Sequence, residues 1–304
     1  MKPLGGSELM YYTMNDMMET GWDKDVNLML SFCDPNLLDP KRKNVIWQQL
    51  NTNEESVFAL KDTKFVEQID YFVWVSYWVY EKYRQVYNIP AYKSIIIRNA
   101  TQPVKFKPRA KGKIKLVYTS TPWRGLDILV DAFKQLNRDD VELDVFSSTK
   151  IYGPNFEKQT QGQFDWLWDL CKNTPGINYH GYADNDTVRK YVNDAHIFAY
   201  PNTFEETSCI AAIEALTAGC RVITSGYGAL PETCGDWATY IPYGPNREVM
   251  GKRFSAILNQ EIDAYWSKET QTHIKAQSEH YNKLHTWPVR IKEWKNFFNN
   301  IKNV

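Results

Sequence analysis

The chain has 304 residues, of which 43% are hydrophobic and 24% are charged, a composition typical of globular rather than disordered or fibrous proteins. Its 36 basic and 36 acidic residues cancel, which excludes a general attraction to polyanions, and we find no clear nucleic-acid or membrane patch. The length exceeds what one hydrophobic core usually serves and therefore predicts two domains.

Short β-rich runs alternate with helical patterns from the start of the chain, an order typical of a parallel α/β sheet. The expected elements of the first third are a helix over Ser7–Thr20, strands over Val26–Phe32 and Val45–Gln48, a helix over Asn53–Leu60, a strand over Tyr71–Ser76, a helix over Tyr77–Tyr87 and a strand over Ser94–Arg98. They predict one doubly wound domain over residues 1–106.

A stretch rich in proline and basic residues follows, and we place a linker at residues 107–113. A second domain, residues 114–286, again alternates strands and helices. Its expected strands are Ile114–Thr119, Glu142–Ser147, Ile177–Gly181, Ile197–Tyr200 and Arg221–Ser225, and its expected helices include Leu126–Leu136, Gln161–Lys172 and Asp186–Asp194. In residues 287–304 the amphipathic segment Trp287–Phe298 predicts a helix that packs back on the first domain.

Nothing in the chain indicates secretion or membrane insertion. No run approaches about 18 consecutive apolar residues, and the N-terminus has no apolar signal region. The five cysteines are an odd number without a CxxC pair, so we expect neither a disulfide framework nor a zinc site. These features favour a cytoplasmic protein.

The strongest functional signal is a strand–loop–helix unit within residues 199–219. A buried strand ends at Tyr200, a loop carries Glu205 and Glu206, and a helix is expected to begin near Ser208. Free backbone N–H groups and the positive end of the helix dipole converge at a helix N-terminus, which makes it an anion site. We therefore expect a diphosphate here, bound by Thr207, Ser208, Cys209 and Ile210.

Glu214 lies about a turn and a half into that helix, at a rise of about 1.5 Å per residue, so its carboxylate reaches a ligand beside the phosphate. One carboxylate accepts hydrogen bonds from both hydroxyls of a ribose. An isolated pair of glutamates is more often part of an ordinary exposed loop. Here, however, the pair is followed by a helix end, a strand and a second Gly-rich loop that ends at Glu232.

This ordered string resembles the donor-binding core of the retaining glycosyltransferases of the GT-B fold, the large fourth family often called group 1. The family pattern is a proline, two glutamates with seven residues between them, an alanine, a glycine, a strand, a glycine pair and a glutamate. The resemblance implies two Rossmann-like α/β domains with a donor cleft between them. It also implies that Glu206 faces the sugar as a catalytic residue.

Two segments upstream extend the resemblance within the second domain. Residues 118–127 are similar to the first strand and loop of the family's donor domain, with Arg124 in place of a lysine that contacts the donor phosphate. Arginine keeps the charge and adds a bidentate fork, although Thr-Ser-Thr at 119–121 replaces a usual Gly-Arg pair. Residues 176–182 resemble the loop over the nucleotide base, where Gly181 and Tyr182 would contact the base.

The N-terminal segment Pro3–Glu8 resembles the family's first Gly-rich loop, in which Gly5 and Gly6 would face the sugar and the donor phosphate. A Gly-Gly-Ser sequence at a helix start is also an ordinary cap, with Ser7 as the capping residue. The family places a strand before this loop, whereas this chain begins almost at the loop. Either the first strand is absent or the recorded start is internal, and we expect a short first domain.

All five histidines lie in the second half, so the first domain offers no imidazole base of the kind that inverting transferases use. This distribution favours retention, in which the leaving diphosphate takes the acceptor proton and the protein stabilises its charge. Many members have a sugar-contacting histidine in the first domain. The nearest candidates here, Gln48, Gln49 and Asn51, supply hydrogen bonds but no base.

We expect metal-independent transfer without a cofactor, because Asp139-Asp140 reads as a turn and Asp184–Asp186 as a helix cap. The leading hypothesis is a retaining transferase that moves a sugar from a UDP- or GDP-sugar to a hydroxyl of a glycan or other acceptor. Two alternatives stay open. One is a transferase that glycosylates modified bases in DNA, and the other is a non-catalytic sugar-nucleotide or glycan binding protein on this scaffold.

Overall fold

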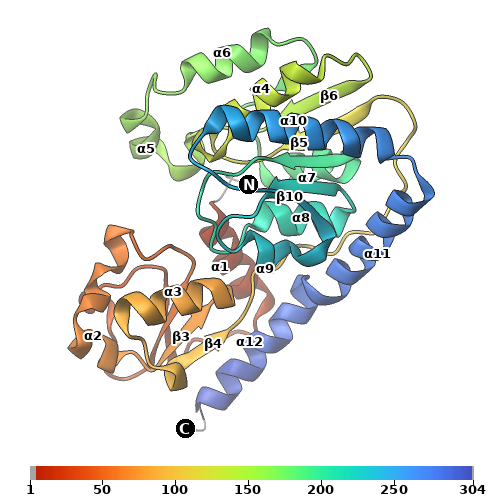
Figure 1. The fold of residues 1–304 in the computed structure, drawn as a ribbon. Helices are drawn as coiled ribbons and strands as arrows, with labels where there is room; N and C mark the ends of the chain where they lie inside the picture. Colours follow the sequence, from red (N-terminus) through yellow and green to blue (C-terminus); the bar gives the residue numbers. More distant parts are fainter. Residues whose placement is uncertain (1–4, 303–304) are drawn as a thin grey trace.

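Two parallel sheets form in the computed structural model, which describes residues 5–302 (Figure 1). The first sheet has the order β1 (Val26–Leu30), β2 (Lys43–Gln48), β3 (Tyr71–Trp74) and β4 (Ser94–Ile96). The second has the order β10 (Ala238–Ile241), β9 (Arg221–Ser225), β8 (Ile197–Tyr200), β5 (Ile114–Tyr118), β6 (Val141–Val145) and β7 (Ile177–Tyr179). The predicted α/β class with two Rossmann-like sheets is confirmed.

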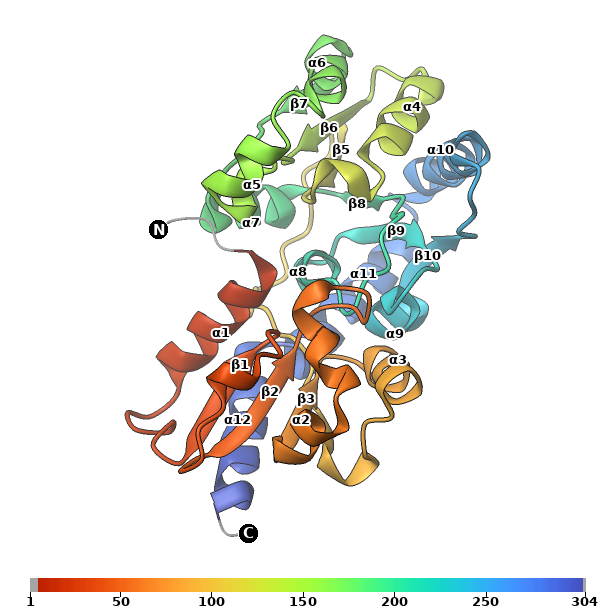
Figure 2. The ribbon, with the colours of Figure 1, turned by 90° about the vertical axis from the view of Figure 1, so that its left-hand side faces the viewer.

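The first sheet is covered by helices from both ends of the sequence. Its own helices are α1 (Gly6–Met17), α2 (Thr63–Gln68) and α3 (Tyr77–Tyr87), with the short 3-10 helices η1 (Pro35–Leu37), η2 (Glu55–Lys61) and η3 (Ala91–Lys93). The last helix, α12 (Trp287–Lys302), lies on the same sheet (Figure 2). Trp294 of α12 packs edge-on against Trp47 of β2, with ring centroids 4.6 Å apart, so the C-terminal segment shares the first core.

The remaining helices of the described residues belong to the second domain. These are α4 (Leu126–Leu136), α5 (Pro154–Gln159), α6 (Asp165–Asn173), α7 (Asn185–Asp194), α8 (Ile210–Ala218), α9 (Leu230–Cys234), α10 (Arg247–Ala264) and α11 (Lys268–Leu284), with the 3-10 helices η4 (Pro122–Arg124), η5 (Lys150–Tyr152) and η6 (Gly235–Trp237). The predicted bounds of α4 are confirmed, because its i, i+3, i+4, i+7 stripe is buried against the sheet.

Several predicted elements differ from the structure for local reasons. The predicted helix over 53–60 is the 3-10 helix η2, and Asp62 caps the separate helix α2 that follows. The predicted helix over 161–172 begins only at Asp165, because Gly162 adopts a left-handed conformation with φ of 78°. Strand β10 was not predicted: it has four residues, lies at the sheet edge and buries only one of them.

The chain crosses between the two domains twice, and the crossings lie side by side. The amide of Thr101 donates to the carbonyl of His285 at 3.0 Å, and the amide of Trp287 donates to the carbonyl of Thr101 at 3.0 Å. The segment after the first crossing follows the second domain, where Arg109 donates to the carbonyls of Ala195 and Ala218. Backbone pairing thus fixes the two connections to each other.

All five cysteines are buried and free. None of the helices within residues 5–302 combines the length and apolar content needed to cross a membrane.

Candidate active site

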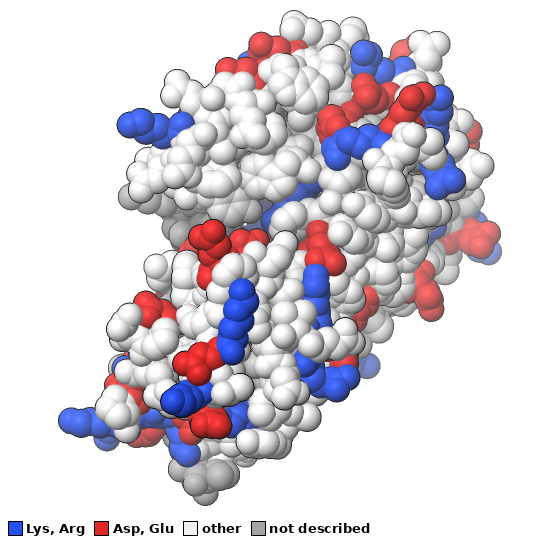
Figure 3. All heavy atoms as spheres, turned by 60° about the vertical axis from the view of Figure 1, so that its left-hand side comes forward, with Lys and Arg blue, Asp and Glu red and all other residues white. Residues whose placement is uncertain are grey.

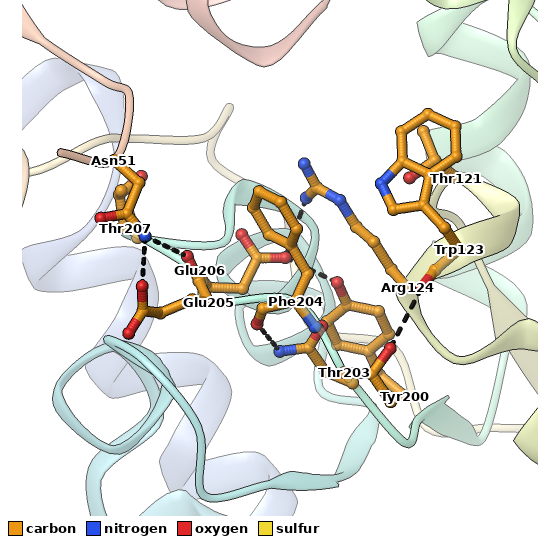
Figure 4. A network of polar contacts seen from close by, with 12 residues as sticks. Asn51, Thr121, Trp123, Arg124, Tyr200, Thr203, Phe204, Glu205, Glu206 and Thr207 are labelled. Carbon is orange, nitrogen blue, oxygen red and sulfur yellow. Dashed lines mark hydrogen bonds and ion pairs between the residues drawn. The ribbon is translucent and has the colours of Figure 1, made fainter. Parts of the chain in front are cut away.

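The carboxylate of Glu206 is the centre of a buried polar cluster (Figure 4). Its Oε1 atom accepts a hydrogen bond from Nη1 of Arg124 at 2.9 Å and one from the Tyr200 hydroxyl at 2.6 Å. Tyr200 ends β8, and Arg124 closes η4 just after the neighbouring strand β5. Because the strands are parallel, their carboxyl ends meet at one edge, which is where open α/β sheets bind ligands.

The surroundings of Arg124 and Tyr200 keep the first side chain charged and the second neutral. Burial lowers the pKa of Arg124, but Glu206 and nearby tyrosines more than compensate, and the net pKa lies above the ordinary value for arginine. Burial, and then the charge of Glu206, raise the pKa of Tyr200, so its hydroxyl stays a neutral donor. The Arg124 guanidinium also lies 4.0 Å above the ring of Phe204, a cation–π contact that holds its plane.

The helix expected near Ser208 begins later than predicted. Cys209 has a φ of 71°, a left-handed conformation rare for residues other than glycine, and α8 starts at Ile210. Its N-terminal amides therefore begin with Ile210, since the amide of Ile213 already donates to the carbonyl of Cys209. The predicted placement of Thr207 and Ser208 at the helix N-terminus is wrong, because both precede it.

The first Gly-rich loop lies against the start of α8. A Cβ atom added at Gly6 would lie 3.1 Å from Cδ1 of Ile210, which shows how closely the two domains approach here. The predicted Ser7 cap is wrong, because α1 begins at Gly6 with Gly5 as the N-cap residue and without a side-chain bond. Residues Pro3 and Leu4 of the same motif lie outside the described residues.

The second Gly-rich loop supports the backbone of Glu206. A Cβ atom at Gly228 would lie 2.6 Å from both the nitrogen and the carbonyl oxygen of Glu206, and Gly228 has a φ of 63°. Only glycine fits this left-handed conformation and this close approach. The amide of Ala229 donates to the Glu206 carbonyl at 2.7 Å, so the loop holds Glu206 from behind.

Glu214, on α8, pairs with Arg189 of α7 at 3.2 Å between Oε1 and Nε. Burial raises the pKa of Glu214, and Arg189 opposes this by stabilising the charged form. The side chain is still 16% exposed, so a ligand can reach it. Sequence reasoning missed Arg189, because the apolar stripe of α7 (Val188 and Val192) marks its buried face and does not show which charged residue beside it pairs with a glutamate of another helix.

A cavity of about 640 Å³ opens at the carboxyl ends of β6 and β7. Gly181 and Tyr182 line it, together with Lys150 and Trp168. Tyr152 lies in the same short helix, η5, as the cavity residue Lys150, and its hydroxyl oxygen is 3.5 Å from Nη2 of Arg124. The cavity therefore lies beside the Glu206 cluster. The sequence did not predict this cavity, because its walls come from loops and short helices.

The amides proposed from the sequence in place of a first-domain histidine make other contacts. Gln49 and Asn99 exchange two hydrogen bonds of 2.9 Å each, and the Gln48 amide donates to the carbonyl of Ser31. Of these three side-chain amides, that of Asn51 contacts the second domain, where Nδ2 donates to the carboxylate of Glu205.

The predicted cap at Asp184 is confirmed, because its carboxylate accepts a hydrogen bond from the Thr187 amide at the start of α7. Among residues 5–302 no group of three or more His, Cys, Asp or Glu side chains is arranged to hold a metal ion.

The site lies between the two domains, where the surface is hollowed and lined by acidic and basic side chains (Figure 3). Two tandem parallel sheets, with a glutamate-bearing loop at the carboxyl edge of the second facing the first, define the GT-B class of α/β proteins. The family model of glycosyl transferases group 1 matches residues 99–279, and the chain belongs to this family.

Solved structures share the fold across nearly the whole chain. A glycosyltransferase from Rickettsia africae covers 98% of this chain and 81% of its own at 14% identity and a TM-score of 0.68. Sucrose-phosphate synthase from Thermosynechococcus elongatus covers 97% and 79% at 15% identity and a TM-score of 0.65. Anabaena HepE in complex with UDP-glucose covers 85% and 72% at 14% identity and a TM-score of 0.64. At these identities the likeness concerns the fold. A search of curated proteins finds no match.

Proposed function

We propose that the chain is a retaining glycosyltransferase of the fourth family, which transfers a sugar from a nucleoside-diphosphate sugar to a hydroxyl of a glycan or another acceptor. The observation that carries this proposal is the buried Glu206–Arg124 pair beside the start of α8, at the edge of the donor domain that faces the first domain. Family membership supports the reaction class. The structure of HepE with UDP-glucose supports a UDP-sugar as the first donor to test.

In this proposal the donor extends across the carboxyl edge of the second sheet. The base binds in the cavity beside Gly181 and Tyr182, and the ribose hydroxyls donate to Glu214. The diphosphate lies between Arg124 and the first amides of α8, where the charge of the guanidinium and the positive end of the helix dipole both attract an anion. Nη1 of Arg124 bonds to Glu206, and Nη2 makes a long contact of 3.5 Å with the Tyr152 hydroxyl, so one of the two Nη2 protons can bind a phosphate oxygen.

Charge stabilisation is then the main chemical task of the protein. As the glycosidic bond to the diphosphate breaks, negative charge grows on the phosphate, and a fixed arginine stabilises it without reorganisation. The acceptor oxygen forms its bond to the anomeric carbon on the face that the diphosphate leaves, which retains the anomeric configuration, and the leaving phosphate takes the acceptor proton. Glu206 contacts the sugar and holds Arg124 in place. We propose that transfer needs neither metal nor cofactor and takes place in the cytoplasm.

A thermal-shift screen against UDP-, GDP-, ADP- and dTDP-sugars tests the proposal. We expect one donor class to stabilise the protein by about 2.7 kcal/mol at about 100 times its dissociation constant. The same donor should then be consumed in the presence of a hydroxyl acceptor. Stabilisation without turnover on any acceptor would instead identify a binding protein, and no stabilisation by any donor would refute the proposal.

Glu214→Ala is expected to weaken donor binding about tenfold, which corresponds to about 1.4 kcal/mol, because the ribose loses one ionised acceptor. Turnover at saturating donor should change little. Isothermal titration calorimetry with the nucleoside diphosphate measures the loss. Asp186→Ala is the matched control, because it removes the other, exposed partner of Arg189 and should leave affinity unchanged. Equal effects of the two variants would count against a ribose contact.

A further inference from the structure

The loop that carries Glu206 is tied to the first domain through the residue before it (Figure 4). Oε2 of Glu205 accepts a hydrogen bond from Nδ2 of Asn51 at 2.5 Å and forms an ion pair with Nζ of Lys82. Lys82 also lies 4.9 Å above the ring of Trp78. The side chains of Lys82 and Glu205 are only 26% and 29% exposed, so solvent screens this pair less than a fully exposed one.

The residue after Glu206 is tied to the first domain as well. The hydroxyl of Thr207 donates to the carbonyl of Gln49 at 2.8 Å, and the Thr207 carbonyl accepts a bond from the hydroxyl of Ser76 at 2.7 Å. Glu206 is therefore flanked on both sides by residues that bind the first domain. Its own carboxylate points the other way, toward Arg124 in the second domain.

This arrangement makes the position of the Glu206 carboxylate depend on the first domain. On the side away from the first domain, Gly228 packs against the backbone of Glu206, and the amide of Ala229 donates to its carbonyl. The Glu206 backbone therefore cannot move toward this loop. A shift of about 1 Å at Glu205 or Thr207 would therefore move the carboxylate out of line with Arg124, and misplacement of that size is costly in catalysis.

Other contacts already hold the two domains together at α3. The carboxylate of Glu232, on α9, accepts hydrogen bonds from the amides of Tyr77 and Trp78 at 2.9 and 2.8 Å and pairs with Arg98 at 2.7 Å. It caps the N-terminus of α3 from the opposite domain, which complements the helix dipole. The contact between Lys82 and Glu205 is thus not required for the domains to meet.

We propose that Lys82 is a positioning residue of the transfer reaction, which acts through Glu205 to hold Glu206 in line with Arg124. The inference rests on the proposed function. Since Glu214 and the cavity beside Gly181 lie entirely in the second domain, loss of Lys82 should impair turnover and spare donor binding. That split separates positioning from a general loss of structure.

The test compares Lys82→Met and Lys82→Arg with Arg84→Met. Arg84 lies on the same helix and pairs only locally with Glu81 among the contacts of the described chain, so its variant is the matched control. We expect Lys82→Met to lower kcat about tenfold with an unchanged dissociation constant for UDP or the donor nucleotide found by the screen. Lys82→Arg should restore most of the activity, and Arg84→Met should match the unchanged protein.

Hydrogen exchange at the amides of residues 205–207 gives a second readout that needs no activity. Lys82→Met should speed exchange there, whereas Arg84→Met should not. Unchanged exchange, or unchanged kcat in an active protein, overturns the proposal, and so does an equal loss of donor affinity and kcat. A protein that transfers no sugar from any donor refutes the proposed function, and the exchange data still decide whether Lys82 orders the loop.

Discussion

Glu206→Ala is expected to lower kcat by about 100- to 1,000-fold while donor affinity changes much less. The carboxylate is buried, it fixes the Arg124 guanidinium and, in the proposed reaction, it contacts the transferred sugar. Loss of one preorganised charged group from such a site typically costs a factor of this size in turnover. Steady-state kinetics with the identified donor, together with calorimetric titration of the nucleoside diphosphate, measure the two effects separately.

Two companion variants show whether the loss comes from this carboxylate. Glu206→Gln keeps the shape and a carbonyl acceptor for Tyr200 but removes the charge, so its turnover should fall between that of the unchanged protein and that of the alanine variant. Glu142→Ala removes an ion pair with Lys115 at the start of β6, remote from the loop, and should leave kinetics unchanged. Full activity of Glu206→Ala would refute the assigned role.

The fold was predictable because its signals are local. The strand Ile197–Tyr200 is buried at every position, as expected of a central strand in a parallel sheet, and its bounds were predicted from the run of apolar residues. The amphipathic stripe of α4 is equally direct. Strand β10 and the helices α2 and α5 have few residues and short apolar patterns, so composition alone does not single them out.

The site was predictable only where its residues are close in sequence. Glu206 and Glu214 belong to one strand–loop–helix unit, and their spacing fixes them on one edge of the sheet. The start of α8 was misplaced because Cys209 adopts a left-handed conformation. A sequence predicts this conformation only where glycine or asparagine stands, and cysteine gives no such signal. The pairing of Lys82 with Glu205 joins two domains, and no local pattern specifies it.

Arg124→Met is expected to lower kcat by a factor of about 100 to 1,000 relative to the unchanged protein, because the leaving diphosphate loses its fixed cation. It should also lower the free energy of unfolding by about 3–5 kcal/mol, because Glu206 remains buried without its partner. Arg124→Lys keeps the charge without the bidentate fork and should retain part of the activity. Chemical denaturation and steady-state kinetics measure the two losses.

The double variant Arg124→Met with Glu206→Gln distinguishes the two roles of this pair. Replacing both charges removes the unpaired buried carboxylate, so stability should recover toward that of the unchanged protein, whereas activity should stay as low as in Arg124→Met alone. This non-additivity in stability, with no recovery in kcat, is the signature of an ion pair whose groups both act on the substrate. Recovery of activity together with stability would show instead that Arg124 and Glu206 only hold the loop in place.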